Sequence, residues 1–128
     1  MGRPSANQTF FQQEDRMTDF NGKRALVTGA AGGIGAAVVR AFRARGAVVA
    51  AADRDTGAVE AEAHLDGNLL DPAYADGLPA AAAKALGGLD IVVNNAGVIT
   101  RGKVTDTSDH DWALSVGVNI EAPFRISR

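Results

Sequence analysis

The chain of 128 residues contains no cysteine. Zinc sites built on cysteine, iron–sulfur clusters and thiol catalysis are therefore excluded, and a domain of this size can bury a core without disulfides. An excess of charge of one sign is also missing, since 13 Lys and Arg stand against 15 Asp and Glu, for a formal net charge of -2. This balance gives no electrostatic reason to expect nucleic acid or an anionic membrane as a partner.

A long hydrophobic run is absent from the start of the chain. Residues 1–17 are polar and aperiodic, and they lack the apolar stretch that a secretory signal or a membrane span requires. We therefore expect an extension or leader without fixed structure over residues 1–17 and a folded domain over residues 18–128. A cytoplasmic location is the default expectation for such a chain.

Apolar runs of strand length alternate with helical patterns along the rest of the chain. The predicted strands cover residues 24–28, 47–52, 61–65 and 89–93, and the predicted helices cover residues 34–45, 79–86 and a final segment capped by Ser108. Asp71 and Pro72 look like an earlier helix start, but Gly77 and Pro79 interrupt that pattern, which favours a start at Pro79. In the final helix, apolar side chains repeat every four residues along one face, at Trp112, Val116, Ile120 and Phe124.

This order of elements predicts an α/β fold with a doubly wound, Rossmann-like parallel sheet. In the usual strand order, the fourth strand lies outermost in the first half, and the next helix delivers a fifth strand beside it. No fifth strand follows in the sequence, so residues 91–93 would lie on an open edge, which native sheets avoid. We therefore expect an incomplete fold, the first half of a larger domain.

A glycine-rich loop joins the first predicted strand to the first predicted helix. Residues 28–35 read Thr-Gly-Ala-Ala-Gly-Gly-Ile-Gly, which fits the spacing T-G-x-x-x-G-x-G. A phosphate needs backbone N–H donors at a helix N-terminus and no side chains in the way, and this loop offers both. Ordinary tight turns also use glycines, but the position after the first strand favours a site for the pyrophosphate of a dinucleotide.

An acidic residue, Asp53, follows the second predicted strand, 20 residues after Gly33. A carboxylate at this place can accept hydrogen bonds from both ribose hydroxyls of an adenosine and would repel a 2′-phosphate, so it favours NAD over NADP. Two alternatives stay open: Arg54 could pair with a phosphate, and Asp53 taken alone could be a surface turn residue.

Together with Asn94-Asn95-Ala96-Gly97 after the fourth strand and Val118-Asn119 in the last helix, these motifs resemble the short-chain dehydrogenase/reductase family. The resemblance covers about residues 20–128. It implies an NAD(H)-dependent oxidoreductase that transfers hydride between nicotinamide and a small-molecule alcohol or carbonyl substrate. It also implies a homotetramer or homodimer, with the long final helix as one contact face. The alternative is a non-catalytic dinucleotide-binding or regulatory module of the same fold.

The resemblance assigns cofactor-binding roles by position. The phosphate loop would be Gly29, Ala31, Gly32, Gly33, Ile34 and Gly35; the adenosine side would be Asp53, Arg54, Asn68 and Leu69; the nicotinamide side would be Asn95, Ala96, Gly97 and the backbone of Val118. Asn68 stands where the family has an acid. Its amide oxygen can still face the adenine amino group, so binding should survive.

Asn119 matches the helix asparagine of the family's Asn-Ser-Tyr-Lys catalytic group, whose backbone carbonyl holds a water in the proton relay. Pro123 has no N–H, so the Asn119 carbonyl lacks its normal helical donor four residues on. A simple proline kink is the other interpretation of this pair. In the family the serine and the Tyr-x-x-x-Lys pair follow the asparagine, and the chain shown ends at Arg128. Tyr74 has no lysine four residues on and is no substitute.

Two further groups of residues, the histidines and the pair after the Asn95-Ala96-Gly97 segment, carry polar side chains that could take part in binding. His64 and His110 are isolated histidines and make a poor ligand set, so no metal site is predicted. Thr100 and Arg101 follow the Asn95-Ala96-Gly97 segment, and we expect them at the entrance of a substrate pocket.

Overall fold

Four parallel strands form the centre of the fold in the computed structural model, which describes Gly2 and residues 19–128. They are β1 (Arg24–Thr28), β2 (Val48–Asp53), β3 (Ala63–Asp66) and β4 (Ile91–Val93), in the order β3-β2-β1-β4. The predicted leader, apart from Gly2, lies outside the described residues. The strand order confirms the predicted doubly wound fold, and within the described part of the chain β4 is an edge strand, as predicted.

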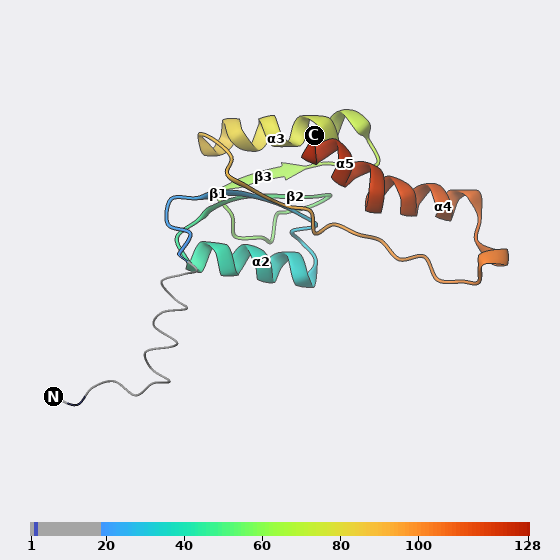
Figure 1. Ribbon diagram of the computed structural model, residues 1–128, viewed down its shortest axis with the longest axis horizontal. Helices are drawn as coiled ribbons and strands as arrows, with labels where there is room; N and C mark the ends of the chain where they lie inside the picture. Colours follow the sequence, from blue (N-terminus) through green and yellow to red (C-terminus); the bar gives the residue numbers. More distant parts are fainter. Residues whose placement is uncertain (1, 3–18) are drawn as a thin grey trace.

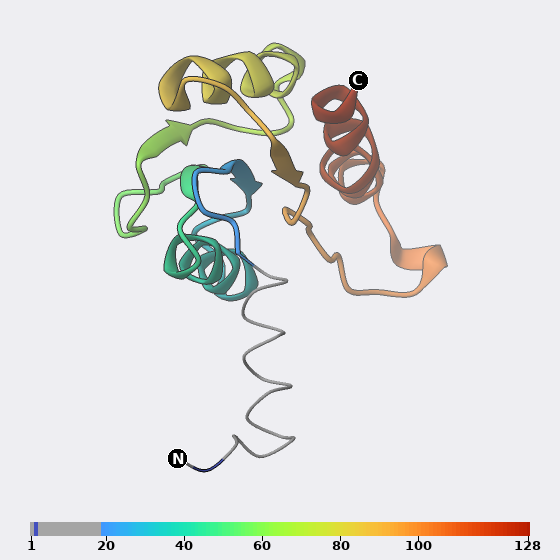
Figure 2. The ribbon, with the colours of Figure 1, turned by 60° about the vertical axis from the view of Figure 1, so that its left-hand side comes forward.

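Helices cover both faces of the sheet because the central strands are apolar on both faces (Figures 1 and 2). Helix α2 (Gly33–Ala44) packs on the side chains of Ala25, Val27 and Val49. Helices α3 (Pro72–Leu86) and α5 (Ala122–Ser127) pack on the opposite face, around Leu26 and Ala50. The carboxyl ends of β1, β2 and β4 remain uncovered between these two layers.

Helix α3 corrects the prediction of a helix that starts only at Pro79. The Asp71 side chain accepts from the Ala73 N–H at 3.0 Å, so the earlier cap is used and Pro79 lies inside one continuous helix. Ala75, Leu78 and Ala82 are buried against the sheet, whereas a Cβ at Gly77 would meet nothing within 4 Å. Packing of the buried face therefore outweighs the low helix propensity of Gly and Pro, which propensity alone could not predict.

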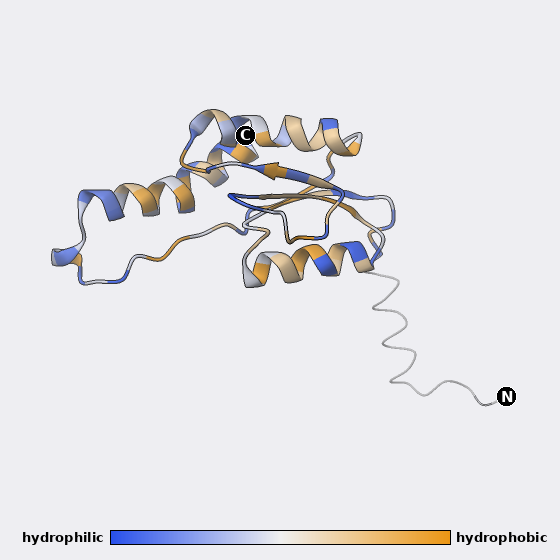
Figure 3. Ribbon diagram, turned by 180° about the vertical axis from the view of Figure 1, so that it is seen from behind, coloured by the Kyte–Doolittle hydropathy of each residue, from blue (hydrophilic) through white to orange (hydrophobic). Residues whose placement is uncertain are grey.

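The final helix is less regular than predicted. After the predicted Ser108 cap come α4 (Asp109–Val116), a π-helical turn η2 (Gly117–Glu121) and then α5. The apolar repeat does not face the core: Trp112, Ile120 and Phe124 are 67%, 65% and 60% exposed, and the buried residues are Val118, Ala122 and Ile126. Figure 3 shows apolar residues along α4 where it projects beyond the sheet.

The strand ends differ from the prediction by one or two residues. Strand β4 begins at Ile91, and the Asp90 carboxylate just before it accepts from the Arg24 main-chain N–H at 2.9 Å and from Arg24 Nε at 3.0 Å. Asp53 is the last residue of β2 rather than the residue after it. A single 3-10 turn, η1 (Val104–Asp106), interrupts the loop between β4 and α4.

Candidate functional site

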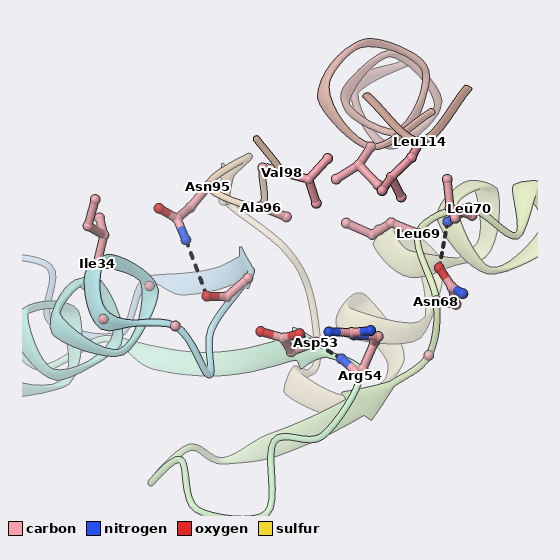
Figure 4. A pocket seen from close by; sticks show the side chains of 17 residues that line it. Ile34, Asp53, Arg54, Asn68, Leu69, Leu70, Asn95, Ala96, Val98 and Leu114 are labelled. Atoms are coloured by element: carbon pink, nitrogen blue, oxygen red, sulfur yellow. Dashed lines mark hydrogen bonds between the residues drawn. The ribbon is translucent and has the colours of Figure 1, made fainter. Parts of the chain in front are cut away.

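A pocket of about 580 Å³ opens at the carboxyl ends of β1, β2 and β4, where ligands bind in open α/β sheets (Figure 4). It brings together all of the predicted cofactor-binding residues except Ala31. The predicted residues that line it are Gly29, Gly32, Gly33, Ile34, Gly35, Asp53, Arg54, Asn68, Leu69, Asn95, Ala96, Gly97 and Val118. Four more lining residues were not predicted, namely Gly67, Leu70, Val98 and Leu114.

The glycines of the phosphate loop divide into two kinds. A Cβ at Gly35 would lie 2.0 Å from the Gly29 carbonyl oxygen, and Gly29 has a φ of +64° with Ala96 Cα 2.8 Å from its missing Cβ. These two glycines are required by the fold itself. A Cβ at Gly33 would meet nothing within 4 Å, and one at Gly32 only the Gly29 oxygen at 3.5 Å. Packing within the chain therefore does not explain why Gly32 and Gly33 lack side chains, whereas an anion at the N-terminus of α2 would.

The hydroxyl of Thr28 joins the phosphate loop to the segment after β4. It accepts from the main-chain N–H groups of Asn95 and Ala96, both at 3.1 Å. The Asn95 amide in turn donates to the carbonyls of Thr28 and Gly29 at 3.1 and 3.3 Å. The two segments thus form one unit. We did not predict this role for Thr28, since the contact spans more than sixty residues of sequence.

Both carboxylate oxygens of Asp53 are held by main-chain N–H groups. Oδ2 accepts from Ala31 at 3.0 Å, and Oδ1 accepts from Arg54 at 2.7 Å. Ala31 therefore acts through its backbone, by turning the carboxylate toward the loop, although it does not line the pocket. Each oxygen keeps a second acceptor position for a ribose hydroxyl. The Arg54 side chain lies next to Asp53 at the same end of the pocket (Figure 4).

The opposite part of the pocket is apolar. Leu69 and Leu70 from the β3–α3 loop approach Val98 and Leu114 there (Figure 4). Asn68 forms a turn in which its Oδ1 accepts from the Leu70 N–H at 2.9 Å. This bond identifies the oxygen of the Asn68 amide and leaves that oxygen a second lone pair, so the predicted contact with an adenine amino group stays a prediction.

Asn119 lies in the π-helical turn η2 and does not line the pocket. Its amide clamps the main chain of Val98: Oδ1 accepts from the Val98 N–H, and Nδ2 donates to the Val98 carbonyl, both at 2.9 Å. The turn closes through the Ala122 N–H, which donates to the Gly117 carbonyl. The predicted irregularity before Pro123 is therefore a π-turn, a feature often found at functional sites. The clamp on Val98 was not predicted.

Tyr74 is engaged elsewhere, as its lack of a partner lysine indicated. Its hydroxyl donates to the Leu65 carbonyl, and its ring fills the space over Gly67. Burial, followed by the charges of Asp66 and Asp53, raises the pKa of Tyr74 to about 12. A phenol whose pKa lies this far above neutral pH, and whose hydroxyl is already bound, is poorly suited to proton transfer near neutral pH.

The two histidines lie apart, on β3 and α4. His64 Nδ1 is 2.9 Å from the hydroxyl of buried Thr56, and His110 is exposed in the first turn of α4. In the described part of the chain, no three His, Asp or Glu side chains gather as a metal site would require. Thr100 and Arg101 do not line the pocket; the Thr100 hydroxyl is 3.4 Å from that of Ser115.

The pocket and its glycine loop have counterparts in known proteins. A family profile described as short chain dehydrogenase matches residues 23–128. The chain belongs to this family. Nodulation protein G of Rhizobium sp. (strain N33) is 38% identical over 120 aligned positions, and the match covers 88% of this chain and 49% of that relative. The 3-oxoacyl-[acyl-carrier-protein] reductase FabG of Escherichia coli is 34% identical over 118 residues, covering 86% of this chain and 48% of the relative.

Solved short-chain dehydrogenases share the fold. A short chain dehydrogenase from Burkholderia cenocepacia J2315, in complex with NADP, matches with a TM-score of 0.80 and 34% identity, over 86% of this chain and 50% of that one. The chain thus spans about half the length of the relatives it matches and corresponds to the first half of their Rossmann-like fold. None of the helices among residues 19–128 is both long enough and apolar enough to cross a bilayer.

Proposed function

We propose that this short-chain dehydrogenase is an NAD(H)-dependent oxidoreductase that acts on an alcohol or carbonyl substrate. The observation that carries the proposal is the bare N-terminus of α2. Gly32 and Gly33 face the pocket without a packing reason, and the Asp53 carboxylate lies across from them at the end of β2. A dinucleotide presents the matching groups, a pyrophosphate next to a ribose with two hydroxyls.

The described residues would hold the coenzyme rather than carry out the whole reaction. When bound, the nicotinamide supplies the hydride that passes to or from the substrate carbon. The loop glycines would bind the pyrophosphate, and Asp53 the adenosine ribose. Asn95 and Ala96, tied to Thr28, would line the other ribose. Asn119 would hold a relay water at its carbonyl, while its side chain keeps Val98 in place.

The preference for NAD over NADP rests on Asp53. Two of the similar structures, the one from Burkholderia cenocepacia and a metagenomic short-chain oxidoreductase, are complexes with NADP, so the preference proposed here sets this chain apart from them. In this chain the carboxylate is fixed beside the glycine loop by two main-chain bonds, and a 2′-phosphate bound there would face a negative charge.

Fluorescence titration with NADH and NADPH tests the coenzyme assignment. We expect NADH to bind more tightly, and Asp53→Asn to weaken NADH by roughly tenfold, about one charge-assisted hydrogen bond. Asp55→Asn is the matched control, because Asp55 accepts from the Gly57 N–H in the same loop and does not line the pocket. Tighter binding of NADPH to the wild-type protein would contradict the assignment.

The alternative is a non-catalytic module of the same fold, and one observation on Tyr74 is consistent with it. Tyr74 is held by the Leu65 carbonyl and burial raises its pKa to about 12, so it does not supply the tyrosine of the family's catalytic group. Hydride transfer from NADH to a panel of carbonyl compounds, followed at 340 nm in the purified protein, distinguishes the two. Coenzyme binding without turnover on any of them, together with the lack of a serine and a Tyr-x-x-x-Lys pair after Arg128, would favour the module.

For association, we propose a homodimer or homotetramer in which a second copy covers Trp112, Ile120 and Phe124. These side chains lie on the final helix and are more than half exposed, which is costly for large apolar groups in water. Light scattering of the protein with Ile120→Glu should report a smaller particle than wild type. A cytoplasmic location and the lack of nucleic-acid and membrane partners stay predictions from the sequence.

A further inference from the structure

We propose that a contact between Leu70 and Gly117 positions the π-turn that carries Asn119. Leu70 belongs to the apolar part of the pocket, which we assign to adenine and call the adenine end. Leu70 is then a positioning residue for the relay carbonyl. The proposal rests on the proposed dinucleotide site and adds a role for two residues outside the cofactor-binding motifs.

Helix α4 is attached to the body of the protein mainly at its C-terminal end. None of its residues is buried, and in Figure 1 it projects away from the sheet. Around the junction with η2 the attachments are the Thr100–Ser115 hydroxyl pair, the Asn119 clamp on Val98, and Leu70 against Gly117. The π-turn is also held by its own buried Val118 and by the packing of α5 that follows it, so Leu70 is one of several contacts that position it.

The glycine at position 117 is explained by its neighbour. Its φ of -62° and ψ of -46° are ordinary helical values, so the backbone does not require glycine. A Cβ there would lie 2.7 Å from Leu70 Cδ2, the end of a flexible side chain, so an alanine would make the Leu70 side chain shift. Since glycine is one of the poorest helix formers, its use at this position fits the close approach of Leu70.

Leu70 belongs at the same time to the adenine end of the pocket. It follows Asn68 and Leu69, and its N–H is fixed by the Asn68 side chain at 2.9 Å. The Leu70 side chain is 43% exposed in the open pocket. On the other side of the π-turn, Val98 lines the pocket and is bound by Asn119. A base bound between Leu70 and Val98 would therefore contact both side chains, and through them it would restrain the π-turn.

AMP tests this contact because it carries the adenine, its ribose and one phosphate but lacks the nicotinamide half of the dinucleotide. Two amide protons report on the π-turn: the Val98 N–H, bound to Asn119 Oδ1, and the Ala122 N–H, bound to the Gly117 carbonyl. In the wild-type protein, saturating AMP should slow hydrogen exchange of both by about fivefold or more. Gly117→Ala and Leu70→Ala should each lose most of this slowing at saturating AMP, the first by displacing the Leu70 side chain from the turn and the second by removing most of that side chain.

The double variant with Leu70→Ala and Gly117→Ala should recover the slowing, because the new methyl group at position 117 fills part of the space that Leu70 vacates. Gly77→Ala is the matched control, since it adds the same methyl group to a helical glycine where a Cβ meets nothing within 4 Å, and it should behave as wild type. If AMP and NADH fail to bind the wild-type protein, the proposed function is wrong. If they bind and the slowing is equal in wild type, Leu70→Ala and Gly117→Ala, the positioning role is overturned.

Discussion

Two neighbouring glycines of the same loop should respond in opposite ways to one added methyl group. Gly33→Ala places a Cβ in open space at the first position of α2, whereas Gly35→Ala places one 2.0 Å from the Gly29 carbonyl oxygen. The first change tests the inference that Gly33 lacks a side chain so that a ligand can approach the backbone. The second tests the inference that Gly35 lacks a side chain because the fold leaves no room for one.

The magnitudes follow from these surroundings. At Gly33 alanine should stabilise the helix by up to about 1 kcal/mol. It should weaken NADH binding by the loss of at least one N–H contact to phosphate, about 1.5–3 kcal/mol, or roughly 10- to 150-fold. At Gly35 the clash should exceed the gain in helix propensity and lower the free energy of unfolding by about 1–3 kcal/mol or more. The melting temperature should then fall by roughly 4 °C or more for each kcal/mol.

Thermal unfolding followed by circular dichroism measures stability, and calorimetric titration with NADH measures binding. We expect Gly33→Ala to keep or raise the melting temperature and to lose affinity, and Gly35→Ala to lower the melting temperature. Gly77→Ala on the open side of α3 is the control for a glycine with neither role. Wild-type affinity in Gly33→Ala would refute the assignment of this loop to phosphate binding.

Three other perturbations should give defined results. Thr28→Val leaves the N–H groups of Asn95 and Ala96 without their acceptor and should destabilise the fold by about 2 kcal/mol or more in denaturant unfolding, while Thr28→Ser should not. Tyr74 is the only tyrosine, so absorbance at 295 nm should give its pKa directly, and we expect about 12. Its contribution to stability should be present below pH 10 and lost as the pH rises toward 12. A pKa near 10 would contradict the burial of Tyr74. Hydrogen bonding to Arg24 lowers the pKa of Asp90, so wild type should lose stability as the pH falls through that pKa, and Asp90→Asn should show a smaller loss in acid.

The sequence by itself determined those features that depend on neighbouring residues. The glycine spacing of residues 28–35 predicted the turn from β1 into α2, since the positive φ of Gly29 and the close approach at Gly35 allow no side chain. The apolar runs predicted four strands, and their order along the chain predicted the sheet, because parallel strands joined by helices have few possible arrangements. The Ser108 cap was likewise predicted, whereas the Asp71 cap was recognised but set aside in favour of a helix start at Pro79.

Only the tertiary structure decided which face of each helix meets the sheet and which distant residues share the pocket. Helix α3 continues through Pro79 because Ala75, Leu78 and Ala82 gain more from packing than the proline costs. The repeat at Trp112 and Ile120 predicted a helix, yet a helical period carries no information about which partner surface is present. The contacts of Thr28 with Asn95, and of Leu70 with Gly117, join segments that are far apart in the sequence, so no local pattern records them.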